Sequence, residues 1–181
     1  MKLATQLKVA VLTLGLGLLG LSKAQAVTGT ADATITVTPN ITVSLSIAPT
    51  NYAFGIVDLS SQVVSGSSIT LTNSSQVSVS MQKRIQTNPA NWTAAANVGA
   101  DAYVLYAATS TFRPDVSDFQ AGNHKFGLVS TDTALKGIGG GTPTLAATNG
   151  AVDLWFRLDT PSSVSTVAGQ IITLRFTGTA L

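Results

Sequence analysis

Apolar and polar residues alternate along much of this 181-residue chain, with apolar side chains at every second position. An extended backbone places such side chains on one face, so the spacing predicts half-buried β-strands rather than helices. The clearest case is residues 152–158, with the sequence VDLWFRL. The other expected strands of this kind are residues 35–37, 41–47, 52–56, 69–71, 77–85, 124–129 and 172–176. Residues 103–107 are mostly apolar instead, which predicts a central strand buried on both faces.

Stretches rich in Ser and Gly separate these segments, β-branched residues are abundant and Glu is absent. This composition favours strands over helices. About nine short strands with such spacing predict an all-β fold, a two-sheet antiparallel sandwich of the immunoglobulin-like or jelly-roll kind. We expect a single domain of this kind over residues 27–181.

The N-terminus has a different pattern. Lys2 and Lys8 flank the start of the chain, an apolar run covers residues 9–21, and Ala24 and Ala26 follow. This order is typical of a secretory signal peptide, and the run is shorter than the roughly 20 residues that a membrane-spanning helix needs. We expect cleavage after Ala26. The mature protein is then exported, to a periplasm, a cell surface or the extracellular space, with no membrane span.

Cleavage would also change the charge balance. Three lysines leave with residues 1–26, so seven basic residues face eight aspartates and the formal net charge becomes −1. Lys83 and Arg84 are the one adjacent basic pair that remains, which argues against a nucleic-acid partner. The chain has no cysteine, so neither disulfides nor thiolate chemistry is available.

The mature chain would begin with a segment that invites two interpretations. The sequence ATITVTPNITVSLSIAP at residues 33–49 contains two alternating runs around Pro39 and Asn40. The first interpretation is one strand that crosses between sheets at the proline. The second is that the first run is loosely held and adds to the open sheet edge of a neighbouring copy. The residues of that run are Thr34, Ile35, Thr36, Val37 and Thr38.

Residues 49–81 resemble the start of immunoglobulin-like modules of the hydin type, which are common in exported bacterial proteins. In those modules a Pro-x-x-Tyr-x-Phe-Gly-x-Val strand precedes a serine-rich turn and a Leu-Thr-Asn strand. The matching positions here are Pro49, Tyr52, Phe54, Gly55, Val57, Leu71, Thr72 and Asn73. The resemblance implies a structural or adhesive role and carries no active site.

Candidate catalytic and metal-binding residues are few. His124 is the one histidine, and no Gly-x-Ser-x-Gly motif marks a nucleophile, so we expect no enzyme and interpret His124 as an exposed loop residue. Asp115 and Asp118 lie three apart in a loop and are weak candidates for calcium, because the Asp-x-Asp-x-Asp-Gly spacing is missing. Turn capping explains Asp115 equally well. We expect no other cofactor.

Trp155 and Arg157 share the face of their strand opposite the apolar residues. Trp155 could offer a stacking platform for a sugar, or pack against Arg157 or Arg175 through a cation–π contact. The sequence therefore predicts an exported structural or surface protein. One form of this prediction is a self-assembling subunit of a cell-surface or extracellular-matrix layer or fibre that uses its N-terminal strand. The alternative is an adhesive module that binds surface glycans or proteins.

Overall fold

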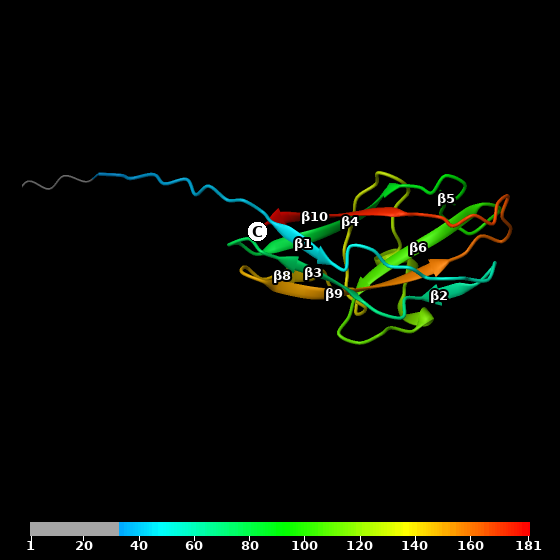
Figure 1. The fold of residues 1–181 in the computed structure, drawn as a ribbon. Coiled ribbons are helices and arrows are strands. Elements are labelled where there is room, and N and C mark those ends of the chain that lie inside the picture. Colours follow the sequence, from blue (N-terminus) through cyan, green and yellow to red (C-terminus); the bar gives the residue numbers. More distant parts are fainter. Residues whose placement is uncertain (1–32) are drawn as a thin grey trace, which may run out of the picture. The chain divides into compact units, whose positions relative to one another are not determined.

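The computed structural model describes residues 33–181, and Figure 1 shows it as a ribbon. The chain divides into two units, Met1–Thr38 and Pro39–Leu181, and the strands found among residues 33–181 belong to the second unit. The predicted signal peptide at residues 1–26 lies outside the described residues. No helix among residues 33–181 has the length and hydropathy that crossing a membrane requires.

The larger sheet has six strands. Its spatial order is β1 (Leu45–Ala48), β3 (Ile69–Asn73), β9 (Gly150–Asp159), β6 (Ala102–Thr109) and β5 (Thr93–Ala94). β2 (Gln62–Val64) pairs with β9 beyond the end of β3. All these pairs are antiparallel except β5 with β6, which is parallel.

A buried serine joins β2 to β3 along the edge of β9. The N–H of Ser65 donates to the carbonyl oxygen of Phe156 at 2.8 Å, and the Ser65 Oγ accepts the N–H of Phe156 at 3.1 Å. The hydroxyl thus replaces a backbone acceptor where the two strands are interrupted, and β9 keeps its hydrogen bonds across the break.

The smaller sheet has four strands and is antiparallel throughout. β4 (Val79–Thr87) is central, with β10 (Thr173–Ala180) on one side and the short strands β7 (Thr133–Ala134) and β8 (Thr144–Leu145) on the other. Figure 1 shows β4 and β10 in one layer and β3 and β9 in the other. A mostly β chain with two sheets is what the alternation predicts, and this prediction is confirmed.

Alternate side chains of both sheets meet in one apolar cluster. Leu71 from β3 and Leu154 from β9 belong to the same cluster as Met81 and Ile85 from β4, and each is at most 1% exposed. The strands of both sheets therefore bury the face that the period-two pattern marks.

The opposite face of the larger sheet is covered by a long connection at residues 110–125. This segment contains the 3₁₀ turn η1 (Val116–Asp118) and the short helix α2 (Ala121–His124). Phe119 from this connection joins Val64, Val104 and Tyr106 in a second apolar cluster. Both faces of β6 are buried for this reason, as its mostly apolar sequence predicts.

Several expected strands differ from the structure. Residues 35–37 and 52–56 form no strand, and residues 124–129 contain the end of α2 and a single bridge from Lys125 to Tyr106. Gly55 has a positive φ of 73°, which turns the chain inside the alternating run, and Ile56 is fully exposed. The larger sheet is not wholly antiparallel, and the short strands β2, β5, β7 and β8 were not expected.

Candidate functional site

The N-terminal segment at residues 34–38 is extended in sequence pattern but has no assigned strand. Its two apolar side chains are largely exposed, with Ile35 at 85% and Val37 at 78%. The segment therefore alternates apolar and polar residues without burying its apolar side chains. Thr34, Thr36 and Thr38 are exposed as well.

β10 forms a long edge of the smaller sheet. It pairs with β4 over its full length, and no strand among residues 33–181 pairs with its other side. The N–H of Leu181 donates to Ser78 O at 3.0 Å, just beyond the end of β10. Backbone groups alternate in direction along an antiparallel ladder. Every second residue counted back from Leu181 therefore points its N–H and C=O groups toward β4. Phe176 and Leu174 lie between those residues, so their N–H and C=O groups point away from β4.

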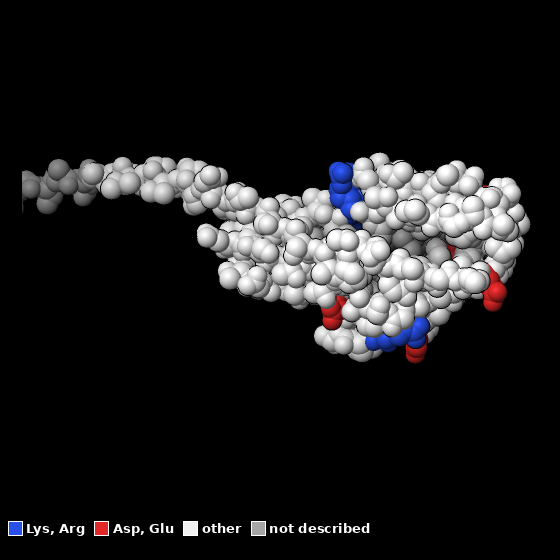
Figure 2. All heavy atoms as spheres, viewed as in Figure 1, with Lys and Arg blue, Asp and Glu red and all other residues white. Residues whose placement is uncertain are grey.

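The inner face of β10 is less buried than that of its neighbour. Val79, Met81 and Ile85 on β4 are at most 1% exposed, whereas Leu174 and Phe176 on β10 are half-buried against the same core. A sheet edge with half-buried apolar residues lacks the cover that another strand would supply. Few charged atoms lie on the face of the molecule shown in Figure 2.

β1 lies close to the C-terminal half of β10. A Cβ built on Gly178 would lie 3.0 Å from the Leu45 Cδ1 and 3.3 Å from the Val43 Cγ1. These two side chains fill the space over Gly178, and any larger residue there would have to push them aside. The C-terminal half of the inner face of β10 is therefore already occupied.

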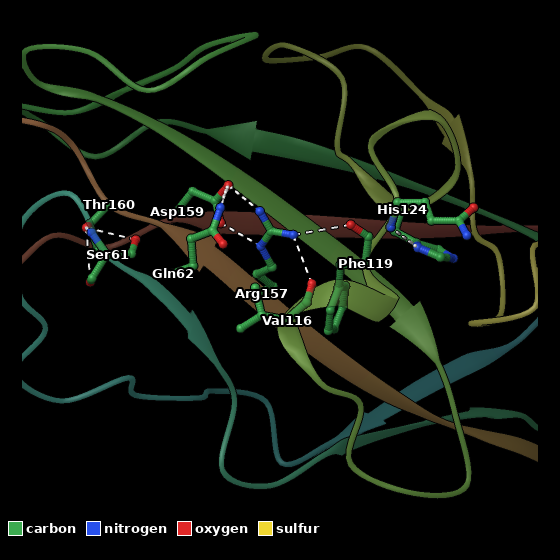
Figure 3. A network of polar contacts seen from close by, with 9 residues as sticks. Ser61, Gln62, Val116, Phe119, His124, Arg157, Asp159 and Thr160 are labelled. Carbon is green, nitrogen blue, oxygen red and sulfur yellow. Dashed lines mark hydrogen bonds and ion pairs between the residues drawn. The ribbon is translucent and has the colours of Figure 1, made fainter.

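Arg157 is buried rather than presented to solvent, although the sequence indicates it as an interaction residue. Its Nε and Nη2 donate to the two carboxylate oxygens of Asp159, each at 2.7 Å (Figure 3). Its Nη1 donates to the carbonyl oxygens of Val116 at 3.0 Å and Phe119 at 3.2 Å. The guanidinium thus fastens the 110–125 connection to β9.

The aromatic partner of Arg157 is Tyr106, whose ring centroid lies 4.5 Å from the guanidinium carbon. Burial raises the pKa of Tyr106, and the nearby Asp159 charge raises it further, while Arg157 lowers it. Trp155 is half-buried, and its Nε1 donates to Ser110 O at 3.0 Å. It packs against the second apolar cluster.

The loop aspartates support local structure. The Asp118 carboxylate accepts the backbone N–H of Asp115 at 2.8 Å, across the single turn of η1. Among residues 33–181, no three His, Asp or Glu side chains gather in a way that could hold a metal ion. This pair of aspartates therefore has the hydrogen bonding of a turn.

His124 is fully buried, which corrects its interpretation as an exposed loop residue. Its Nδ1 accepts the N–H of Gln120 at 2.9 Å, and its Nε2 lies 2.9 Å from Gly137 O. Because Nδ1 accepts, Nε2 carries the proton and donates to Gly137. The ring links α2 to the glycine-rich turn and contacts Phe119 (Figure 3).

Lys83 is a buried charged residue whose burial was not predicted from the sequence. It lies on the inner face of β4 with no exposed surface, where its Nζ donates to Ala134 O at 3.1 Å and lies 5.4 Å from the Phe126 ring centroid. Burial, with a smaller contribution from Lys136, lowers its pKa to about 8. Its place in the alternation with Val79, Met81 and Ile85 was the available signal.

A hollow of about 370 Å³ lies between the end of β6 and the start of β9. Asp153 contributes to its lining and accepts the Thr70 hydroxyl at 2.9 Å. The remaining lining residues are Thr109, Ser110, Thr111, Ala151 and Val152. Hydroxyls and one carboxylate therefore border an open depression near Trp155.

Comparison with known proteins adds no relative. No family model, no curated protein and no solved structure matches the chain.

Proposed function

We propose that this protein is an exported, non-catalytic structural subunit that assembles with copies of itself into a fibre or layer. In this proposal residues 34–38 of one copy add as a strand to a sheet edge of the next. One observation carries the proposal: an alternating segment with exposed Ile35 and Val37 occurs in a chain whose strand β10 has an uncovered edge. The segment has no strand to pair with, and the edge of β10 has no strand paired to it, so the two could pair with each other.

The arrangement of the strands supports this role. In an immunoglobulin-like sandwich one sheet has the order A-B-E-D and the other has C, F and G. We infer that β1, β3, β9 and β6 correspond to the first four, and β4 and β10 to C and F. Among residues 33–181, no strand pairs with β10 on the side where G would lie. A strand from another copy would complete this immunoglobulin-like sandwich.

The chemistry of the segment suits addition to a sheet. Thr, Ile and Val are strand-forming residues, and the segment contains no charge. Ile35 and Val37 would be removed from water, while Thr34, Thr36 and Thr38 would remain on the wet face. Burial of two such apolar side chains contributes about 3–6 kcal/mol before the cost of ordering the segment.

Electron microscopy and light scattering of the protein purified after expression of the 181-residue chain in an exporting host test this function. We expect polymers whose mass grows with protein concentration. The double variant Ile35→Asp, Val37→Asp should remain monomeric because it would bury two carboxylates. The matched control Thr34→Asp, Thr36→Asp changes the exposed face and should still assemble. A wild-type protein that remains monomeric at high concentration would refute the proposal.

A second candidate, binding of surface glycans, is favoured by the hollow that Asp153 and Ser110 line, because the Trp155 Nε1 donates to Ser110 O. Hydroxyl and carboxylate groups at its border could bind sugar hydroxyls, with the indole nearby. A glycan array with wild type and Trp155→Ala tests this role. Binding that the substitution leaves unchanged, or no binding at all, would exclude this site.

A further inference from the structure

We infer that the acceptor edge is β10 of a second copy, and that the incoming strand runs antiparallel to it. Ile35 then lies opposite Phe176, and Val37 lies opposite Leu174. This inference rests on the proposed strand addition and specifies which edge, which register and which direction it uses.

The choice of edge follows from strand length and protection. β1 has four residues, β2 has three, and β5, β7 and β8 have two each, whereas β10 has eight. Exposed edges are usually protected by proline, inward charges or bulges in the middle of the strand. β10 contains no proline, and its one charged residue, Arg175, is on the outer face.

The register follows from what already covers β10. Val43 and Leu45 occupy the space over Gly178, and the pairing of β10 with β4 shifts register between Thr173 and Leu174. Phe176 and Leu174 lie between these limits. Their free N–H and C=O groups point toward an incoming strand, so each can exchange two hydrogen bonds with the residue opposite.

The direction follows from reach and from space. β1 and β10 run in opposite directions (Figure 1), so Ile41 lies beyond Val43 toward the C-terminal end of β10. Measured along the direction of β10, Leu174 and Ile41 are then roughly 20 Å apart, at about 3.4 Å per residue. The four residues from Val37 to Ile41 span at most about 14 Å. A chain cannot place its own segment in this register, but a second copy can.

The opposite direction meets an obstacle. A parallel strand would bring the residue after Thr38 to the Ala180 end of β10, where Val43 of the acceptor already lies against Gly178. An antiparallel strand instead leaves at the Thr173 end. Ile171 and Val167 precede β10 at that end and are 81% and 98% exposed. Each copy then receives at one end and donates at the other, which gives an open head-to-tail polymer.

Paired cysteines test the register, because the chain contains no cysteine of its own. In the proposed register Thr34 lies opposite Thr177 as a non-hydrogen-bonded pair, with Cα atoms about 4.5 Å apart, a distance that a disulfide can bridge. The full chain carrying Thr34→Cys and Thr177→Cys should give a covalent ladder on a non-reducing gel. Thr38→Cys with Thr177→Cys is the matched control, because these residues are then about 14 Å apart.

Each result has a distinct meaning. A ladder from the 34/177 pair and none from the 38/177 pair supports the inference. A ladder from the control pair, or a disulfide closed within one chain, overturns it. Polymers visible by electron microscopy without a ladder from the 34/177 pair overturn the edge or register and leave the proposed function intact. Absence of both polymers and ladders refutes the proposed function itself.

Discussion

Lys83 combines complete burial with a positive charge that has no carboxylate partner among residues 33–181. A carbonyl oxygen and an aromatic ring compensate the ammonium only in part. Its pKa is therefore lowered from 10.5 to about 8. Below about pH 8 the folded protein holds a desolvated charge, which costs free energy. Between about pH 8 and 10.5 the folded amine is neutral while the unfolded one still binds a proton, so this group makes stability rise with pH.

We predict that Lys83→Met increases the free energy of unfolding at pH 7 by about 1–3 kcal/mol, because methionine fills a similar volume without a charge. The difference between variant and wild type should shrink from pH 8 to 10.5. Urea unfolding at several pH values measures both effects. Arg84→Met is the control: Arg84 pairs with Asp132 at 3.5 Å near the surface, so its loss should change stability little. A destabilised Lys83→Met protein would contradict the prediction.

Arg157 and Asp159 form a buried pair with side chains about one-tenth exposed. We predict that Asp159→Leu lowers the free energy of unfolding by about 3 kcal/mol or more, because it leaves the guanidinium buried without its carboxylate. The double variant Arg157→Met, Asp159→Leu should lose less than the single variant, since no charge is stranded. Thermal unfolding of the three proteins measures this order. A double variant that is the least stable would show that the contacts to Val116 and Phe119 dominate.

At the scale of elements, the sequence identified strands where alternation continued without a turn. Residues 152–158 fall inside β9, residues 172–176 overlap β10, and residues 77–85 overlap β4. The same pattern misled at residues 52–56, where the positive φ of Gly55 turns the chain. The two-residue strands β5, β7 and β8 exist because a long neighbour supplies the pairing. Such long-range support leaves no local signal.

The candidate site could be predicted only in part for the same reason. The alternating Thr and Ile or Val residues at residues 34–38 allowed the sequence to predict a segment that adds to a neighbouring sheet. The uncovered edge of β10 was not predictable, because it depends on which strands become neighbours across the chain. The burial of Arg157 was equally hidden, since the 110–125 connection that covers it shows no periodicity. Only tertiary contacts show which face of a sheet such a loop covers.

The 110–125 connection depends on His124 for its link to the glycine-rich turn. We predict that His124→Phe keeps the ring but leaves the Gln120 N–H without a partner and Gly137 O with the Gly140 N–H alone, at a cost of about 1–3 kcal/mol. Hydrogen exchange should accelerate at residues 120–124 and 137–141 and remain slow in β4. Asn123→Ala removes an exposed hydrogen bond to Gln120 and should have little effect. Uniform acceleration across both sheets would contradict a local role.

At the scale of the whole molecule, a polymer of this kind would be built from backbone hydrogen bonds and apolar contacts rather than charge. The donor residues 34–38 are uncharged, and Arg175 is the charged residue on the acceptor strand. Screening by salt weakens contacts between exposed charges but leaves strand pairing largely unaffected. We therefore predict that the extent of polymerisation changes little between 50 and 500 mM NaCl, as sedimentation measures. Dissolution at high salt would show that ion pairs hold the copies together.

A free donor segment should compete with the one on the neighbouring copy. We predict that a synthetic peptide of residues 33–38 shortens the polymers, because a copy whose β10 is occupied by peptide can no longer accept another. The assembly-defective Ile35→Asp, Val37→Asp chain keeps its own β10, so the peptide should raise its melting temperature as peptide concentration increases. A control peptide with aspartate at positions 35 and 37 should do neither. If the active peptide changes neither polymer length nor melting temperature, β10 does not bind this segment.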